Sequence, residues 1–161
     1  MERGDPAPTG RCAPWADPVG HARRVPLPSR ALPYAAAAAG GVVGALARWG
    51  VAEALPSPAG GWPWATLLVN VTGCALIGVL VAVLLARAPT HPWLRPFLVT
   101  GVLGGYTTYS TFTVDVVRLV DAGAVATAVG YLLASVLGGL LAVVAGLAAG
   151  RALVRRPGAA R

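Results

Sequence analysis

The sequence predicts an all-α integral membrane protein with four transmembrane helices, the third of them broken at its middle. Of its 161 residues, 56% are hydrophobic and 12% are charged, and the mean hydropathy is +0.66. Soluble domains carry about twice that share of charged residues. The apolar residues fall into four segments long enough to cross the ~30 Å hydrocarbon core of a bilayer, over residues 34–55, 65–86, 94–120 and 122–150.

The chain begins with a tail, residues 1–32, that we expect to be disordered. It carries six prolines among arginines and small residues, a composition that buries too little apolar surface to fold. A secretory signal peptide is the competing interpretation, because the cleavage-like triplet Ala45-Leu46-Ala47 follows the arginines. Against it, Arg48 would sit at the cut and further spans follow. A basic tail, residues 151–161, closes the chain around the membrane domain of residues 33–150.

The first predicted span places a permanent charge beside a packing face. Gly40, Gly44 and Arg48 recur every four residues and therefore share one side of the helix. Arg48 then has two interpretations. It is either a functional charge within the membrane, or a side chain that snorkels to the interface from within two turns of the end of the span.

The second predicted span contains one strongly polar residue, Asn70, with Gly73 on the same helix face. Trp62 and Trp64 stand at its start, where an interfacial aromatic belt is typical. An amide is costly in lipid unless it is paired. Asn70 therefore either makes an interhelical hydrogen bond that only holds the bundle together, or binds a ligand.

The third segment contains the stretch Gly104–Phe112, which reads GGYTTYSTF. As one straight helix the segment would measure about 40 Å, longer than the ~30 Å core, so it must tilt or break. The glycine pair loosens the backbone and the threonine hydroxyls compete for helix carbonyls. We therefore expect a break near residues 104–109 rather than a continuous helix that packs through its small residues, and the freed carbonyls and amides of such a break can hold ions.

Polar residues also follow the break. Asp115 lies at helical spacing from Thr111 and from Arg118, so it either faces the same path as Thr111 or pairs with Arg118. In the fourth span, Tyr131 and Ser135 lie one turn apart and interrupt an otherwise apolar sequence.

We expect no enzyme, because no nucleophile, base and orienting group can be assembled. The two histidines, His21 and His91, fall in the tail and in a loop, and no cluster of metal ligands surrounds Cys12 or Cys74. All thirteen basic residues are arginines, and most lie in tails and loops rather than along one face. This pattern argues against nucleic acid as a partner.

Three stretches together resemble the CrcB/Fluc family of fluoride channels: Gly40–Trp49 (GGVVGALARW), Leu68–Gly73 (LVNVTG) and Gly104–Phe112. The resemblance covers about residues 34–150. It implies an antiparallel dimer in the lipid of the plasma membrane, the bacterial inner membrane, with two fluoride pores around a structural sodium ion. It also implies passive fluoride export that lowers cytoplasmic fluoride without an organic cofactor.

The resemblance further assigns roles to individual residues. It implies that the backbone carbonyls of Gly104 and Thr107 hold the sodium ion, as suits a hard cation, and that Arg48 raises the local positive potential. Asp115 stands where the family usually has glutamate, and the first pore aromatic is tyrosine rather than phenylalanine. The fluoride path would be lined by an amide, two hydroxyls and two electropositive ring edges, from Asn70, Tyr109, Ser110, Thr111 and Phe112.

Two other classes of membrane protein are alternatives to a fluoride channel. A proton-coupled small multidrug exporter also has four short spans in an antiparallel dimer, but it needs a carboxylate deep in the first span, where this chain has Arg48. A non-transporting scaffold subunit would leave the hydrogen-bond donors on the second and third spans unexplained.

The arginines are distributed unevenly along the predicted topology. With four spans, the amino-terminal tail, the second loop and the carboxyl terminus share one side, and they hold eleven arginines against Arg118 and Arg48. The positive-inside rule then predicts that both termini are cytoplasmic. Because an antiparallel homodimer requires one sequence to insert both ways, we expect the partner to be an inverted homologous chain, with a homodimer as the alternative.

Overall fold

The computed structural model describes residues 28–58, 60–87 and 92–155. These residues are helical apart from short connections and contain no strand, so the all-helical prediction is confirmed for them. The tail through residue 27, and with it Cys12 and His21, lies outside the described residues, as does His91. The helices are α1 (Pro28–Ala54), α2 (Trp64–Arg87), η1 (Pro96–Leu103), α3 (Gly104–Tyr106), α4 (Tyr109–Asp121) and α5 (Val125–Arg155).

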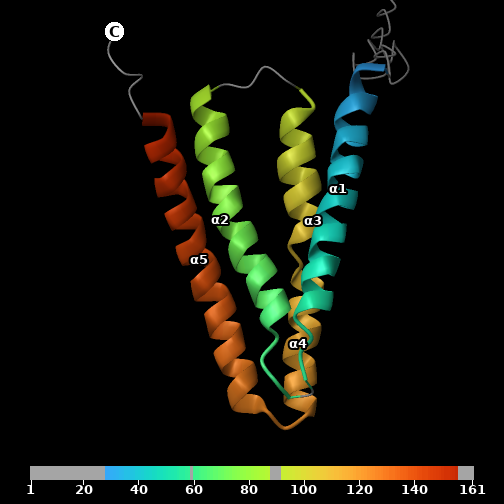
Figure 1. Ribbon diagram of the computed structural model, residues 1–161, viewed down its shortest axis with the longest axis vertical. Coiled ribbons are helices and arrows are strands. Elements are labelled where there is room, and N and C mark those ends of the chain that lie inside the picture. Colours follow the sequence, from blue (N-terminus) through green and yellow to red (C-terminus); the bar gives the residue numbers. More distant parts are fainter. Residues whose placement is uncertain (1–27, 59, 88–91, 156–161) are drawn as a thin grey trace, which may run out of the picture.

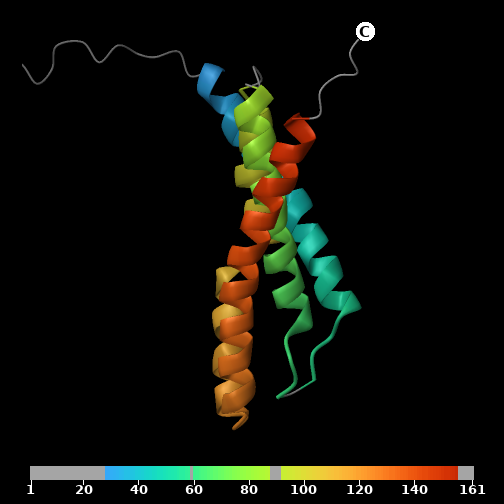
Figure 2. The same cartoon turned by 90° about the vertical axis from the view of Figure 1, so that its left-hand side faces the viewer.

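The helices form two neighbouring pairs. In Figure 1, α1 lies beside η1 and α3, α2 lies beside α5, and α4 continues from α3 toward the lower end of the view. The start of α1 and the ends of α2 and α5 lie at the upper end. Figure 2 shows the lower halves of α1 and α2 leaning away from α4 and the lower half of α5.

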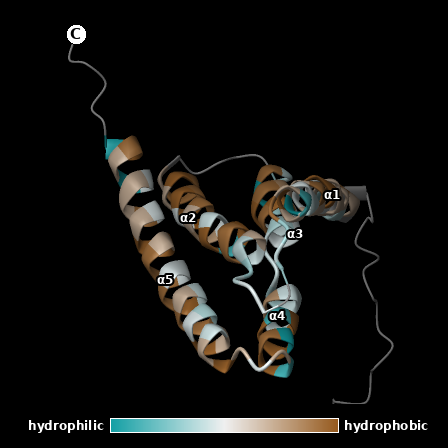
Figure 3. Cartoon of the chain, turned by 60° about the horizontal axis from the view of Figure 1, so that its bottom comes forward, coloured by the Kyte–Doolittle hydropathy of each residue, from teal (hydrophilic) through white to brown (hydrophobic). Residues whose placement is uncertain are grey.

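Three helices are long and apolar enough to cross a membrane. They are Ala31–Ala54, Trp64–Ala86 and Val125–Arg155, with mean hydropathies of 1.3, 2.5 and 2.4, and apolar residues cover most of α2 and α5 in Figure 3. Helical backbone extends into residues 28–32 and 151–155, which we expected to belong to the tails. A helix can protrude from the bilayer, so the ends of the spans themselves stay predictions.

Glycines bring the paired helices into backbone contact. A Cβ atom added to Gly44 of α1 would overlap the Val102 carbonyl oxygen of η1, and one added to Gly146 of α5 would overlap the Ala75 carbonyl oxygen of α2. A Cβ on Gly101 would lie 2.6 Å from the Ala37 carbonyl oxygen. Membrane helices associate by close approach through small residues, because lipid provides no hydrophobic driving force between helices.

Few side chains are buried within the single chain. Tyr131 is fully buried at the lower end, and Trp62 and Phe112 pack beside it. In contrast, Leu140 and Leu141 on α5 are 62% and 71% exposed. A helix that is apolar on its exposed side suits lipid or another membrane subunit rather than water.

Candidate functional site

The helical backbone is interrupted at two threonines. Thr107 (φ −81°, ψ 157°) and Thr108 (φ −148°, ψ 123°) are extended between α3 and α4. Gly104 is helical (φ −64°, ψ −34°), so the interruption follows the glycine pair rather than coinciding with it. The segment before it, Pro96–Leu103, is a π-helix, a rare form that often marks functional sites and that the sequence pattern did not predict.

Asn70 of α2 pairs with the interrupted backbone. Its Nδ2 donates to the Thr108 carbonyl oxygen at 2.9 Å, and the Thr108 N–H donates to Asn70 Oδ1 at 2.9 Å. The two bonds fix the orientation of the amide, because only its oxygen can accept and only its nitrogen can donate. The interhelical role considered for Asn70 is therefore present, and one Nδ2 hydrogen remains for a ligand.

The carbonyls of Gly104 and Thr107 both lose their helical partners. In a continuous helix the N–H of Thr108 would bond to the Gly104 carbonyl, but it bonds to Asn70. The N–H of Thr111, the helical partner of Thr107, donates instead to Thr108 Oγ1 at 3.1 Å. Among the described residues, the backbone hydrogen bonds outside the helices include none to either carbonyl. Unpaired carbonyls are costly in lipid and are ligands that a hard cation prefers.

The Thr108 hydroxyl caps the start of α4 and organises the hydroxyls beside it. Besides accepting the Thr111 N–H, Thr108 Oγ1 donates to Thr111 Oγ1 at 3.0 Å and lies 3.3 Å from Ser110 Oγ. Threonine is a favoured N-cap because its oxygen satisfies an amide that the helix leaves free. Since Thr111 Oγ1 accepts from Thr108, its own hydrogen stays available for another acceptor.

Two cavities meet at Thr108. The larger, about 460 Å³, is bordered by α2, α5 and the segment from η1 to α4, and the smaller, about 250 Å³, lies between α1 and α2. Arg48, Thr66 and Thr111 line the smaller cavity, whereas Ser110 and Asp115 line neither of the two. The predicted site residues on the larger cavity are Asn70, Gly104, Thr107, Tyr109 and Phe112.

The two predicted pore aromatics differ in their surroundings. Their ring centroids lie 6.1 Å apart. Phe112 is anchored against Tyr131, with centroids 5.4 Å apart, whereas Tyr109 is 79% exposed and projects from the chain. Tyr109 therefore needs contacts from outside the single chain if it lines a closed path.

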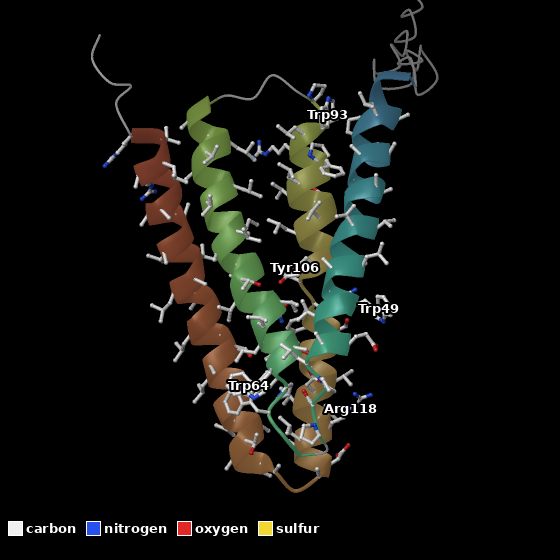
Figure 4. All side chains as sticks on the ribbon, in the orientation of Figure 1. Trp49, Trp64, Trp93, Tyr106 and Arg118 are labelled. Carbon is white, nitrogen blue, oxygen red and sulfur yellow. The ribbon has the colours of Figure 1, made fainter. Side chains whose placement is uncertain are left out.

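Asp115 pairs with hydroxyls rather than with Arg118. Its Oδ2 accepts from Thr66 Oγ1 at 2.7 Å and from the Tyr131 hydroxyl at 3.5 Å. Arg118 is exposed and lies at the lower end in Figure 4. Among the residues that the structure describes, neither Asp115 nor the half-buried Arg48 forms an ion pair.

Sequence reasoning missed three members of this site. Thr66 lies one turn before Asn70, and Ser135 lies one turn after Tyr131, so helical spacing could have indicated both. The Ser135 hydroxyl is buried, lines the larger cavity and has no hydrogen-bond partner among the described residues. Thr108 gave no signal, because a row of hydroxyls does not reveal which one faces α2.

Comparison with known proteins places the chain in a family. The family model described as "CrcB-like protein, Camphor Resistance (CrcB)" matches residues 35–147. "Fluoride-specific ion channel FluC" of Bordetella petrii is 48% identical over 122 residues, covering 76% of this chain and 94% of that protein. The protein of the same name from Paracoccus denitrificans is 47% identical over 116 residues, covering 72% and 92%.

A third relative is matched over a shorter stretch. "Fluoride-specific ion channel FluC 2" of Streptomyces avermitilis is 50% identical over 101 residues, which is 63% of this chain and 64% of that protein, just under two thirds of its length. The family match and the three apolar helices indicate a multi-pass membrane protein. The resemblance seen in the sequence is thus confirmed, and the chain belongs to the CrcB family.

Proposed function

We propose that this chain is a subunit of a fluoride-selective channel in the plasma membrane, through which fluoride leaves the cytoplasm passively. Relatives named as fluoride-specific ion channels support this function. The observation that carries it is the chemistry of the larger cavity, whose lining residues supply an amide, hydroxyls and ring edges but no carboxylate. Such a lining suits an anion and disfavours the cations that a multidrug exporter would carry.

Fluoride must exchange its tightly held water for donors on the protein. Asn70 and Ser135 line the same cavity, and one Nδ2 hydrogen of Asn70 is not used in the bond to Thr108. The edges of Phe112 and Tyr109 add the positive side of the ring quadrupole. Thr111, with a hydrogen to donate, and Arg48 line the second cavity beyond Thr108, where the guanidinium of Arg48 raises the local anion concentration. Ser110 and Asp115 line neither cavity and would act through residues that do, Ser110 beside Thr108 and Asp115 through its hydrogen bond from Thr66.

The segment η1, α3 and α4 is the third of four spans in this proposal, with its break inside the membrane. The lost helical partners of the Gly104 and Thr107 carbonyls fit a sodium ion at this point. Sodium, when bound, would offset the two carbonyl dipoles and add positive charge beside the path. The protein's part is to hold the two carbonyls away from lipid and from other donors.

We further propose that the functional unit is an antiparallel dimer. The larger cavity is open on one side of the single chain, and Tyr109 projects from it. Irregular backbone and polar groups at membrane depth require cover from protein. A second subunit in the opposite orientation would supply that cover and the remaining oxygen ligands of a shared cation.

The partner that fits the charges is an inverted homologous chain. Arg95 lies just before η1 and Arg151 near the end of α5, whereas Glu53 lies near the end of α1, and Arg118 and Asp121 lie near the end of α4. This bias favours cytoplasmic termini for every copy of the chain. A homodimer that inserts both ways is the competing arrangement.

Fluoride release from liposomes tests the function. The protein is purified from cells that express the chain alone, or from cells that also express a charge-inverted copy. In that copy, serine replaces the arginines of the upper end, and arginine replaces Glu53, Ser57 and Asp121. A fluoride electrode is expected to record rapid release when both orientations are present. Equal release of chloride would contradict a fluoride-selective path.

A further inference from the structure

One turn of α2 contacts three consecutive residues of the broken segment. Asn70 bonds to the backbone of Thr108, and the Thr72 hydroxyl lies 3.0 Å from the Tyr106 hydroxyl. Gly73 stands opposite Thr107, and a Cβ atom on this glycine would overlap the Thr107 methyl group. Residues 106, 107 and 108, from the last residue of α3 to the end of the interruption, therefore each contact α2.

The direction of the bond between Tyr106 and Thr72 follows from the supply of hydrogens. Thr72 Oγ1 donates its single hydrogen to the Leu68 carbonyl oxygen at 2.6 Å. The Tyr106 hydroxyl must then be the donor to Thr72 Oγ1. The result is a chain of two bonds that ties the last residue of α3 to the backbone of α2, and Figure 4 shows Tyr106 between these helices.

We propose that Tyr106 and Thr72 are positioning residues, which hold the Gly104 and Thr107 carbonyls in place for the sodium ion of the proposed function. Thr107 lies between two anchors, Tyr106 before it and Thr108 after it. Loss of either anchor lets the extended residues turn toward helical geometry, which would return the carbonyls to backbone partners. The Tyr106 ring lies near Gly73 as well, so its hydroxyl can be removed while the ring stays packed.

The test uses Tyr106→Phe, Thr72→Val and the double variant, with Thr72→Ser as the conservative replacement. Thr113→Val is the matched control, because the Thr113 hydroxyl bonds only to Ser110 of its own helix. The first readout is amide hydrogen exchange of residues 107 and 108 without sodium. We expect exchange to rise about 2- to 10-fold in each single variant, the range for one net hydrogen bond, with no further rise in the double variant and wild-type exchange in Thr72→Ser.

The second readout is the sodium concentration that half-maximally raises the melting temperature of the purified protein, compared with potassium. It is expected to increase by a similar factor in Tyr106→Phe and Thr72→Val and to stay unchanged in Thr113→Val. Unchanged exchange at residues 107 and 108 would overturn the anchor whatever sodium does. Faster exchange with an unchanged sodium midpoint would mean that Tyr106 and Thr72 hold the backbone without affecting sodium binding, and the positioning role would be wrong. Wild-type protein that ignores sodium would refute the sodium part of the proposed function instead.

Discussion

Replacing Asn70 by aspartate tests the donor role of this side chain most severely. The carboxylate keeps an acceptor for the Thr108 N–H but loses the Nδ2 donor that now lies 2.9 Å from the Thr108 carbonyl oxygen. Leaving that carbonyl unpaired costs about 1–3 kcal/mol. A fluoride ion about 4 Å from the new charge would be repelled by about 4 kcal/mol at an effective dielectric constant of about 20. The repulsion alone is therefore expected to lower fluoride occupancy, and with it flux, about 10³-fold.

Asn70→Ala separates the two effects, because it removes the same donor without adding charge. Fluoride flux is measured with an electrode on liposomes that contain equal amounts of dimer. The alanine variant should lose about tenfold in flux, the worth of one hydrogen bond to an ion. The aspartate variant should lose about 10³-fold more, because it adds the charge repulsion. Undiminished flux in Asn70→Asp would remove Asn70 from the path, and equal losses in both variants would mean that Asn70 acts only by holding the break.

Three further predictions concern the ring edge, the helix seam and the partner. Phe112→Ile keeps an apolar side chain but deletes the electropositive edge, so flux should fall far more than dimer yield, and parallel losses would show that the ring only packs against Tyr131. Gly44→Ala should destabilise the chain by about 1–3 kcal/mol, measured as thermal stability in detergent, whereas Gly41→Ala, whose added Cβ meets nothing within 4 Å, should not. Single cysteines at Pro92 and after Arg161, in a background without Cys12 and Cys74, should be labelled from the cytoplasmic side alone, and labelling from both sides would favour the homodimer.

The sequence predicted the helical architecture because hydropathy and length act on whole segments. The contact faces of the helices could also be predicted from the sequence, because glycines such as Gly40 and Gly44 recur at helical spacing and allow close packing. Helical backbone continues beyond the predicted spans at the start of α1 and the end of α5, because a helix does not have to end where its apolar sequence ends. The π-helix before Gly104 had no signature in the hydropathy pattern.

The sequence indicated candidate site residues but not the hydrogen bonds that connect them. Asn70 is conspicuous as an amide in an apolar span, yet its two partners belong to the backbone of Thr108, which no side-chain pattern reveals. For Asp115, spacing along one helix suggested either the same path as Thr111 or a pair with Arg118, whereas the observed partners Thr66 and Tyr131 come from two other helices. Contacts between helices depend on how the helices rotate against one another, and a single sequence leaves that rotation open.

Fluoride release from liposomes that hold the chain in both orientations, with chloride release measured in parallel, tests the proposed fluoride channel most directly. We expect rapid fluoride release, retained chloride, and loss of the fluoride signal when Asn70→Asp is present in both subunits. If fluoride stays inside although cysteine labelling shows both orientations in the membrane and dimers are present, the proposed path through the cavity beside Thr108 is wrong.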